Sequence, residues 1–393
     1  MSIPVVQLRQ LVDSKTGTRN PTTAPDKEFV YVDVAGVDNE AKLISGQRVL
    51  RGSGAPSRAR KLIKTGDVLV STVRPNLNAV AMVPDSLDGE VASTGFCVLR
   101  PNAKVLSEYL FYFVRSSVFI DSLVGLVAGA LYPAVSDTQV LDQLIPLPPI
   151  PEQRRVIDLL SRAEGIVRLR REAQKKAGEL VPAIFLEMFG DPHSNPKSHP
   201  TLPLSKVSEV ISGVAKGRKL LGADVVELPY MRVANVRDGH LDLTEVKAIE
   251  IKKTEIEKLR IKVGDLLMTE GGDPDKLGRA ALWQGEIDLC VHQNHIFKVR
   301  SNLEILSPQY LRSLAGSSYG KAYFFRVAKK TTGIASINKT QLSAFPVVLA
   351  PLSTQMSFAR QVNSVESVLA QQASAAVKAE ATFDALLARV FAG

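Results

Sequence analysis

The sequence has few of the residues on which redox, metal-binding and membrane proteins depend. Its 393 residues include only two cysteines and five histidines, and Cys97 and Cys290 lie far apart without CxxC spacing. No apolar run approaches the ~18–20 residues of a membrane span, and the start MSIPVVQLRQ lacks the pattern of a secretory signal. These absences predict a cytoplasmic protein without membrane contact, in which both cysteines are small core residues.

Sequence motifs for catalysis are also missing. The chain has no GxGxxG or GxxxxGK[ST] phosphate loop, and no [DNS]PP[YF] motif that would hold a flipped adenine. The segment GGDPDK (271–276) favours a tight turn over a nuclease cluster. In CVHQNH (290–295), an extended strand would place Cys290 and His292 on one face and His295 on the other, which disfavours zinc. We therefore expect no catalytic residues, no metal and no cofactor.

Positive charge is the first feature that indicates a partner. The formal net charge is +9, and residues 48–78 hold seven lysines and arginines against one acid, Asp67. A local excess of this kind favours a polyanionic partner.

The chain also repeats itself, with an offset between 198 and 203 residues. A constant order with small drift is what a tandem duplication with changes in loop length produces. The matching pairs are LRQLVDSKTGTR (8–19) with VSEVISGVAKGR (207–218), KTGDVLVST (64–72) with KVGDLLMTE (262–270), VLRPNAKVLSEYL (98–110) with KVRSNLEILSPQYL (298–311), YPAVSDTQVLDQLIPLPPIPEQ (132–153) with GIASINKTQLSAFPVVLAPLSTQ (333–355), and FLEMFG (185–190) with ARVFAG (388–393).

Each repeat begins with a compact mixed module. Residues 1–150 and 204–350 alternate short β-branched runs with turns, which predicts strands, and LSEYLFYFVRSS (106–117) predicts a helix. Residues 190–203 are rich in proline, asparagine and serine, which indicates a linker. The modules should therefore be separate α+β domains.

A long helical segment follows each module. We expect helices over 151–189, with a kink or break near Pro182, and over 351–393, because apolar residues recur there every three or four positions. Uninterrupted, each helix would be about 45–57 Å long at ~1.5 Å per residue. Such an apolar seam needs a partner, either the other helix or the helix's own module. We favour the first, which predicts an α+β fold of two tandem α/β modules whose helices pack antiparallel as a coiled-coil spacer.

Four segments carry a resemblance to the specificity subunits of Type I restriction-modification systems. They are GDVLVSTVRPN and SDTQVLDQLIPLPPIPEQRRVIDLLSRAEGI in the first repeat, and GDLLMTEGG and NKTQLSAFPVVLAPLSTQMSFARQVNSVESV in the second. The resemblance covers essentially the whole chain in the order recognition domain, helix, recognition domain, helix. The second copy departs from the family pattern, with APLSTQ where PPLxEQ is more usual.

The resemblance implies a non-catalytic subunit that reads a bipartite, asymmetric target in double-stranded DNA, one domain per half-site. It would assemble with two copies of an adenine-methylating modification subunit, which carries S-adenosylmethionine, and with a translocating restriction subunit. The helices would serve as ruler and docking surface, with a span of roughly fifteen base pairs. A coiled-coil adaptor with incidental basic patches, and a self-sufficient restriction enzyme, are the alternative hypotheses.

Candidate DNA contacts follow from side-chain chemistry. Arginine and lysine bind phosphates or guanine, and asparagine and glutamine suit adenine. For each cluster, the competing interpretation is an ordinary solvated surface. We expect DNA contacts from Arg19, Arg51, Arg58, Arg60, Lys61, Arg74, Asn76 and Asn78 in the first repeat, and from Lys216, Arg218, Lys219, Lys276, Arg279, Gln293, Asn294, Arg326, Lys329 and Lys330 in the second.

Overall fold

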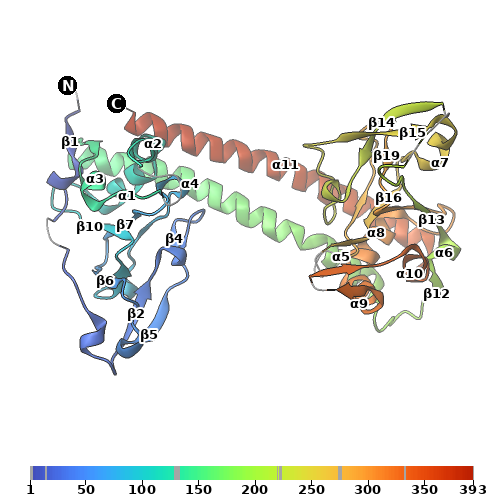
Figure 1. The fold of residues 1–393 in the computed structure, drawn as a ribbon, viewed down its shortest axis with the longest axis horizontal. Coiled ribbons are helices and arrows are strands. Elements are labelled where there is room, and N and C mark those ends of the chain that lie inside the picture. Colours follow the sequence, from blue (N-terminus) through green and yellow to red (C-terminus); the bar gives the residue numbers. More distant parts are fainter. Residues whose placement is uncertain are drawn as a thin grey trace. The chain divides into compact units, whose positions relative to one another are not determined.

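The computed structural model describes residues 3–13, 16–127, 133–218, 220, 224–272, 277–331 and 333–392. The chain divides into two units, one of residues 1–172 with 373–393 and one of residues 173–372 (Figure 1). Each unit therefore combines one module with segments of both long helical regions.

The first module contains two main sheets that meet at one turn. Strands β10, β7 and β8 form an antiparallel sheet, and β5, β2, β9 and β6 form a second sheet in which β2 and β9 are parallel. Thr94 and Gly95 connect β9 to β10 between the two sheets. The elements are β1 (Val5–Gln7), β2 (Glu28–Val32), β3 (Val37–Asp38), β4 (Leu43–Ile44), β5 (Arg48–Arg51), β6 (Ala59–Leu62), β7 (Val68–Ser71), β8 (Val80–Met82), β9 (Val91–Ser93), β10 (Phe96–Leu99), α1 (Ser107–Arg115), α2 (Ser117–Val124), α3 (Asp137–Leu141) and β11 (Leu144–Pro146).

The second module has a similar plan, with different numbers of strands in the two sheets and an additional sheet. Its main sheet has the order β13-β20-β16-β18, a second sheet has the order β15-β14-β19, and a third joins β17, β22 and β21. The elements are β12 (Thr201–Pro203), α6 (Leu204–Val207), β13 (Ser208–Ser212), β14 (Val225–Met231), β15 (Lys247–Lys252), α7 (Ile256–Leu259), β16 (Leu266–Thr269), β17 (Gly271–Gly272), β18 (Ala280–Leu282), β19 (Val291–His292), β20 (Ile296–Ser301), α8 (Pro308–Gly316), α9 (Ser318–Val327), β21 (Lys329–Thr331), β22 (Ile334–Ser336), α10 (Lys339–Ser343) and β23 (Pro346–Val348).

The same buried ion pair holds the main sheet of each module. Arg100 donates to both carboxylate oxygens of Asp67 at 2.8 and 2.7 Å, and Arg300 donates to Asp265 at the same two distances. Both aspartates are 1% exposed, so each carboxylate requires its partner. The repeated GD of the sequence therefore corresponds to a repeated structural pair.

A buried glutamine fixes the start of each long helix. In α4 (Ile150–Gly178), the Gln153 side chain accepts from the Leu106 amide at 2.9 Å and donates to the carbonyls of Lys104 and Pro148, each at 3.0 Å. In α11 (Leu352–Phe391), Gln355 makes the equivalent three bonds, to the Ser307 amide and to the carbonyls of Ile305 and Ala350. The helix is thereby locked to its module.

The first helical segment is interrupted, whereas α11 is continuous. Helix α4 ends at Gly178 and α5 (Leu180–Phe189) begins two residues later. The ring of a proline excludes the carbonyl four residues earlier from helical bonding, and for Pro182 that carbonyl belongs to Gly178. Pro182 itself lies in the first turn of α5, where its missing N–H costs little.

The two helical regions run antiparallel within each unit, as expected. In the first unit, Arg171 on α4 pairs with Glu380 on α11 at 2.7 Å, and Phe391 packs against Tyr109 at 5.3 Å between ring centroids. In the second unit, Phe185 and Phe189 on α5 pack edge-to-face against Phe358 on α11. The start of α4 also packs on its own module through Gln153, so both kinds of contact are present.

Only part of the apolar helical pattern is buried. Leu160 is fully buried, but Leu159, Ile166 and Leu169 are 46, 51 and 62% exposed. Within the part of the chain that the structure describes, none of the helices combines the length and the apolarity that crossing a bilayer requires.

The glutamine lock can be tested in the second module, which contains the single tryptophan, Trp283, as a fully buried reporter. Replacing Gln355 by alanine should lower the free energy of unfolding by about 2–4 kcal/mol, because one amide and two carbonyls lose their partner. Urea unfolding followed by tryptophan fluorescence measures the change. Gln371→Ala, at an exposed position on the same helix, is the control, and equal midpoints for the two variants would contradict the lock.

Candidate nucleic-acid interface

Several predicted residues of the first module gather at one end of its sheets. Residues 72–78 follow β7, and their Val73 bridges Ala134 while the Arg74 amide donates to the Pro133 carbonyl at 2.8 Å. The Thr94 amide donates to the Arg58 carbonyl at 2.8 Å. We call residues 58, 72–78, 94–95 and 133–134 the first loop end.

The geometry of the first loop end presents two side chains outward. Arg74 and Asn78 flank a single 3-10 turn and both have φ +49°, a left-handed conformation that is costly for arginine. The side chains of Arg74 and Asn76 are exposed, whereas Asn78 is half-buried and donates to the Arg115 carbonyl at 3.1 Å. Asn78 thus supports the loop, while Arg74 and Asn76 can reach a ligand.

The other predicted residues of this module are more dispersed. Arg60 donates to the Ala59 carbonyl at 2.7 Å, and Lys61 forms an ion pair with Asp137 of α3. Arg51 pairs with Glu28 at the opposite end of the sheets, and Arg19 lies beside β6, with its amide donating to the Arg60 carbonyl at 2.9 Å and its side chain reaching the start of β9. Arg19 donates to the Gly89 carbonyl at 3.0 Å, and Arg51 lies 3.9 Å from the Glu28 carboxylate. The structure does not bring these two arginines to the first loop end.

The second module has an equivalent loop end. Thr269 of β16 pairs with Ile296 of β20, and the connections after β13, after β16 and before β20 all leave the sheet there. The Asn294 amide donates to the Val214 carbonyl at 2.9 Å, and the Thr269 amide to the Arg279 carbonyl at 3.0 Å. We call residues 213–218, 270–272, 277–279 and 293–295, with strands β17, β21 and β22, the second loop end.

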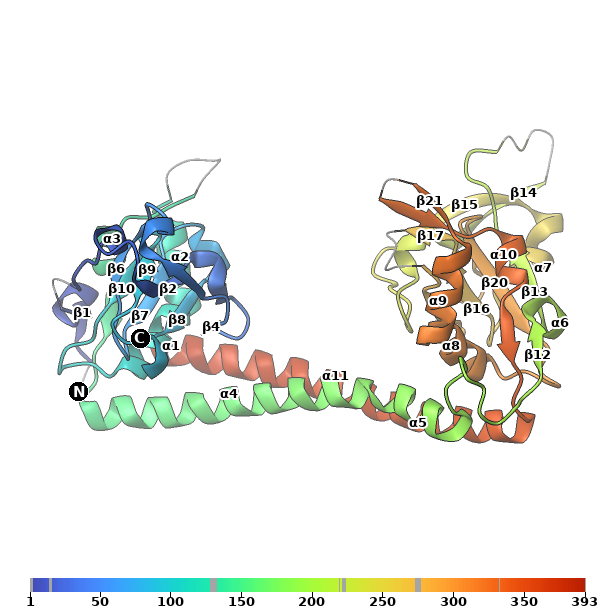
Figure 2. The same cartoon turned by 90° about the horizontal axis from the view of Figure 1, so that it is seen from below.

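Most predicted residues of the second module lie at or beside this end. Lys216, Arg326, Lys329 and Lys330 are exposed there, and Arg279, Gln293 and Asn294 are half-buried. Arg218 is held by two hydrogen bonds to Glu255. Lys219 and Lys276 lie outside the described residues, as does most of the GGDPDK turn. In Figure 2, β17 and β21 lie on the side of the second module away from α5.

The CVHQNH segment belongs to the core beside this end. Cys290 and His292 are fully buried, and Nδ1 of His292 lies 2.9 Å from the Ile296 carbonyl while Nε2 has no partner. Burial lowers the pKa of His292 to about 4, so the ring is neutral near pH 7. Among the described residues, no three histidine, cysteine or acidic side chains are grouped as metal ligands would be. Burial likewise raises the pKa of Cys290 and of the buried Cys97 to about 12.

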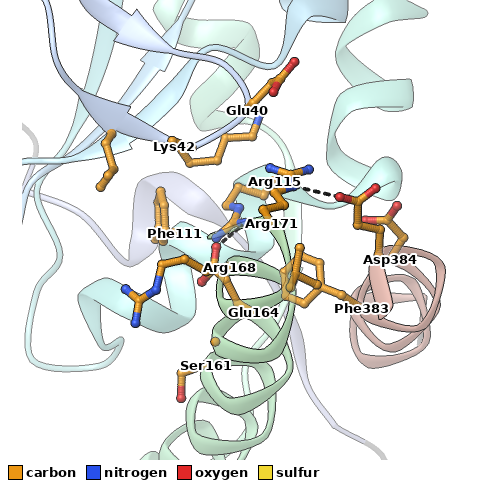
Figure 3. A pocket seen from close by; sticks show the side chains of 15 residues that line it. Glu40, Lys42, Phe111, Arg115, Ser161, Glu164, Arg168, Arg171, Phe383 and Asp384 are labelled. Atoms are coloured by element: carbon orange, nitrogen blue, oxygen red, sulfur yellow. Dashed lines mark hydrogen bonds and ion pairs between the residues drawn. The ribbon is translucent and has the colours of Figure 1, made fainter. Parts of the chain in front are cut away.

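The first unit also contains a cavity of about 650 Å³ beside the first loop end, because its lining residues Lys42 and Arg115 are both hydrogen-bonded to Asn78. Figure 3 shows its lining, which comes from the β3–β4 turn, α1, α4 and the end of α11. Arg115 pairs with Glu164 at 2.6 Å on one wall, and Leu43, which is 61% exposed, lies at the rim. Burial and the positive charge of Arg115 lower the pKa of Lys42 to about 8. The mixture of apolar and paired charged groups suits a protein surface better than a small anion.

Together these features define a duplicated α+β protein in which each module presents basic loops at one sheet end. Residues 4–177 match the Type I restriction modification DNA specificity domain. These residues therefore contain a DNA specificity domain of this family, and most of the chain is similar to Type I restriction-modification specificity subunits.

Individual relatives support this assignment along different parts of the chain. The EcoKI specificity subunit of Escherichia coli is 24% identical over 327 residues, which cover 77% of this chain and 69% of that subunit. The MjaX specificity subunit of Methanocaldococcus jannaschii is 27% identical over 147 residues, but the match covers only 35% of its length and 37% of this chain. A solved chain, from a structure titled for complex assembly and conformational transition of the type I R-M system, is 28% identical with a TM-score of 0.67 over 98% of both chains.

Sequence reasoning missed two groups of residues, one in the framework of the sheets and one at the surface of the second module. The buried Asp67–Arg100 and Asp265–Arg300 pairs support the sheets, and the repeated GD, with an arginine directly after β10 and another near the end of β20, was an available signal. Phe325 and Ile334, which are 49 and 57% exposed beside Lys330, were not predicted, because only the fold decides which apolar residues reach the surface.

The buried His292 predicts a pH-dependent stability. The unfolded state binds a proton with a pKa near 6.5 that the folded ring binds only near pH 4. Stability is therefore fully present above pH 6.5 and should fall by up to about 3 kcal/mol as the pH drops toward 4. Urea unfolding at several pH values, followed by Trp283 fluorescence, measures the slope.

The variant His292→Asn keeps a donor near the Ile296 carbonyl and does not titrate, so its stability should depend less steeply on pH. His240→Asn changes an exposed ring and is the matched control. If His292→Asn retained the wild-type slope, the histidine would not be the titrating group.

Proposed function

We propose that this chain is the DNA sequence-recognition subunit of a Type I restriction-modification complex, and that each module reads one half of a bipartite, asymmetric target. The observation that carries the proposal is the equivalent position of the two loop ends in two modules built on the same Asp–Arg framework. The similarity to specificity subunits supports the same conclusion. The chain itself would bind and not catalyse.

The different loops explain how one framework reads two sequences. The first loop end carries Arg74 and Asn76 at a 3-10 turn that is flanked by two left-handed residues, whereas the second carries β17, β21 and β22. Arginine suits guanine or phosphate and asparagine suits adenine, so unlike loops select unlike half-sites. The long helices would set the separation of the half-sites, which the unbroken run of α11 from Leu352 to Phe391 supports.

The helices and the cavity of the first unit would dock the other subunits. Exposed apolar side chains on α4, Leu159, Ile166 and Leu169, are the kind of surface that marks a protein interface. Each unit presents one module with two antiparallel helical segments, so two copies of a modification subunit can bind equivalent surfaces. The restriction subunit would join this assembly.

The DNA-contact assignment is tested by a pair of charge-matched variants in the first module. Arg74 is exposed after β7, and Lys64 is exposed before the same strand, at its opposite end. Arg74→Ala should weaken binding of the assembled complex to its target duplex by about tenfold or more, since a guanine contact is worth roughly 1–3 kcal/mol. Lys64→Ala should bind as the wild type does.

Titration of labelled duplex at several salt concentrations measures both affinity and type of contact. If Arg74 contacts a phosphate instead, the slope of log affinity against log salt should fall by about one. Equal losses for Arg74→Ala and Lys64→Ala would contradict a localised interface. Binding without sequence preference would favour the coiled-coil adaptor.

The docking assignment is tested at the rim of the cavity. Leu43→Asp should lower the affinity for the modification subunit at least tenfold, because burying an unpaired carboxylate is costly. Val49→Asp, at a residue that is 66% exposed on β5, is the control. Analytical ultracentrifugation of the mixed subunits measures assembly, and an unaltered Leu43→Asp complex would remove the cavity from the interface.

A further inference from the structure

The hairpin of β21 and β22 is a projecting element of the second loop end whose surface is unusual. All three β21 residues are exposed, and Lys329, Lys330 and Thr331 pair with Ser336, Ala335 and Ile334 of β22. Ile334 is 57% exposed although it is a large β-branched residue. Solvation alone does not account for an apolar side chain at the end of a basic ribbon.

The hairpin is held firmly at its base. Gly271 of β17 pairs with Ser336, and a Cβ at Gly271 would lie only 2.7 Å from the Ala335 carbonyl oxygen, so the strands approach more closely than another residue allows. Ala335 and the neighbouring Ile337 are almost fully buried. The exposed residues are therefore presented by an anchored strand.

The two faces of the hairpin carry different groups. Because side chains alternate along a strand, Lys330 shares a face with buried Ala335, and its ammonium lies 3.5 Å from the centre of the Phe325 ring. Ile334 lies on the other face with Thr331 and Lys329. Ile334 is thus the apolar group of an otherwise polar, cationic face.

The charge around Ile334 selects a polyanionic partner. Residues 325–336 include Arg326, Lys329 and Lys330 but no aspartate or glutamate. A two-stranded β-ribbon fits the major groove of B-form DNA, and the apolar group on the base edges there is the 5-methyl group of thymine.

We propose that the β21–β22 hairpin enters the major groove of the second half-site and that Ile334 reads a thymine there through its methyl group. This inference rests on the proposed function and adds to it the element, the groove and the base. Lys329 contacts the adjacent phosphates, and the contact of Lys330 with Phe325 fixes the orientation of the hairpin relative to the rest of the module.

The experiment removes one methyl group at a time from the DNA. The assembled complex is bound to its target duplex, located by the pattern of adenine methylation, and each thymine of both half-sites is replaced in turn by deoxyuridine. At one position in the half-site read by residues 204–350, the wild-type complex should lose roughly fourfold in affinity, the value of one buried methyl group. At the same position, the replacement should not change the affinity of the Ile334→Ala complex, which should bind the thymine and uracil duplexes equally.

A matched variant controls for a general effect of losing an exposed apolar group. Val263 is 71% exposed at the opposite end of β16, and Val263→Ala should keep both wild-type affinity and the preference for thymine. Urea midpoints within error of the wild type for both variants would show that folding is unaffected.

Different results would show failure of the hairpin assignment alone and failure of the proposed function. If Ile334→Ala retained the thymine preference, or if no thymine in that half-site were sensitive, the hairpin assignment would be overturned while sequence-specific binding stood. A wild-type complex that bound all duplexes alike would overturn the proposed function and this assignment with it.

Discussion

The arrangement of the protein depends on a buried glutamine amide at the start of each long helix. Gln153 and Gln355 are fully buried, and each satisfies one backbone amide and two carbonyls. Since an unpaired polar group in a dry core costs several times what a hydrogen bond contributes, the helix cannot slide or rotate without breaking all three bonds. The loop ends therefore keep one orientation toward the helix that follows their module.

The duplicated framework separates support from recognition. The Asp–Arg pairs and the glutamine locks recur with nearly identical distances in both modules, whereas the loop ends share little beyond their position. Buried polar networks tolerate little change, because each member must keep its partner. Exposed loops have no such constraint, so duplication can preserve the scaffold and still produce two different binding surfaces.

Much of the architecture could be predicted from the sequence. The repeats, the helix α1 and the antiparallel helices followed from periodicity and from motif order, and the proline-rich start of α4 marked the end of the first module. The placement of individual side chains could not be predicted in the same way. Arg51 at the end of β5 and Arg74 after β7 are both exposed arginines of one basic region, yet strand pairing places them at opposite ends of the sheets.

The sequence by itself determined the duplication, the class of the modules and the resemblance to specificity subunits, because these depend on local patterns that survive divergence. Tertiary structure decided which groups meet. The fold buries His292, which keeps its ring neutral, and leaves Ile334 exposed. The sequence neighbours of these two residues give no reason for either outcome. Tertiary structure also explains PLPPIPEQ, since two of the three hydrogen bonds of its final glutamine, Gln153, go to backbone groups almost fifty residues earlier, which the fold brings beside it.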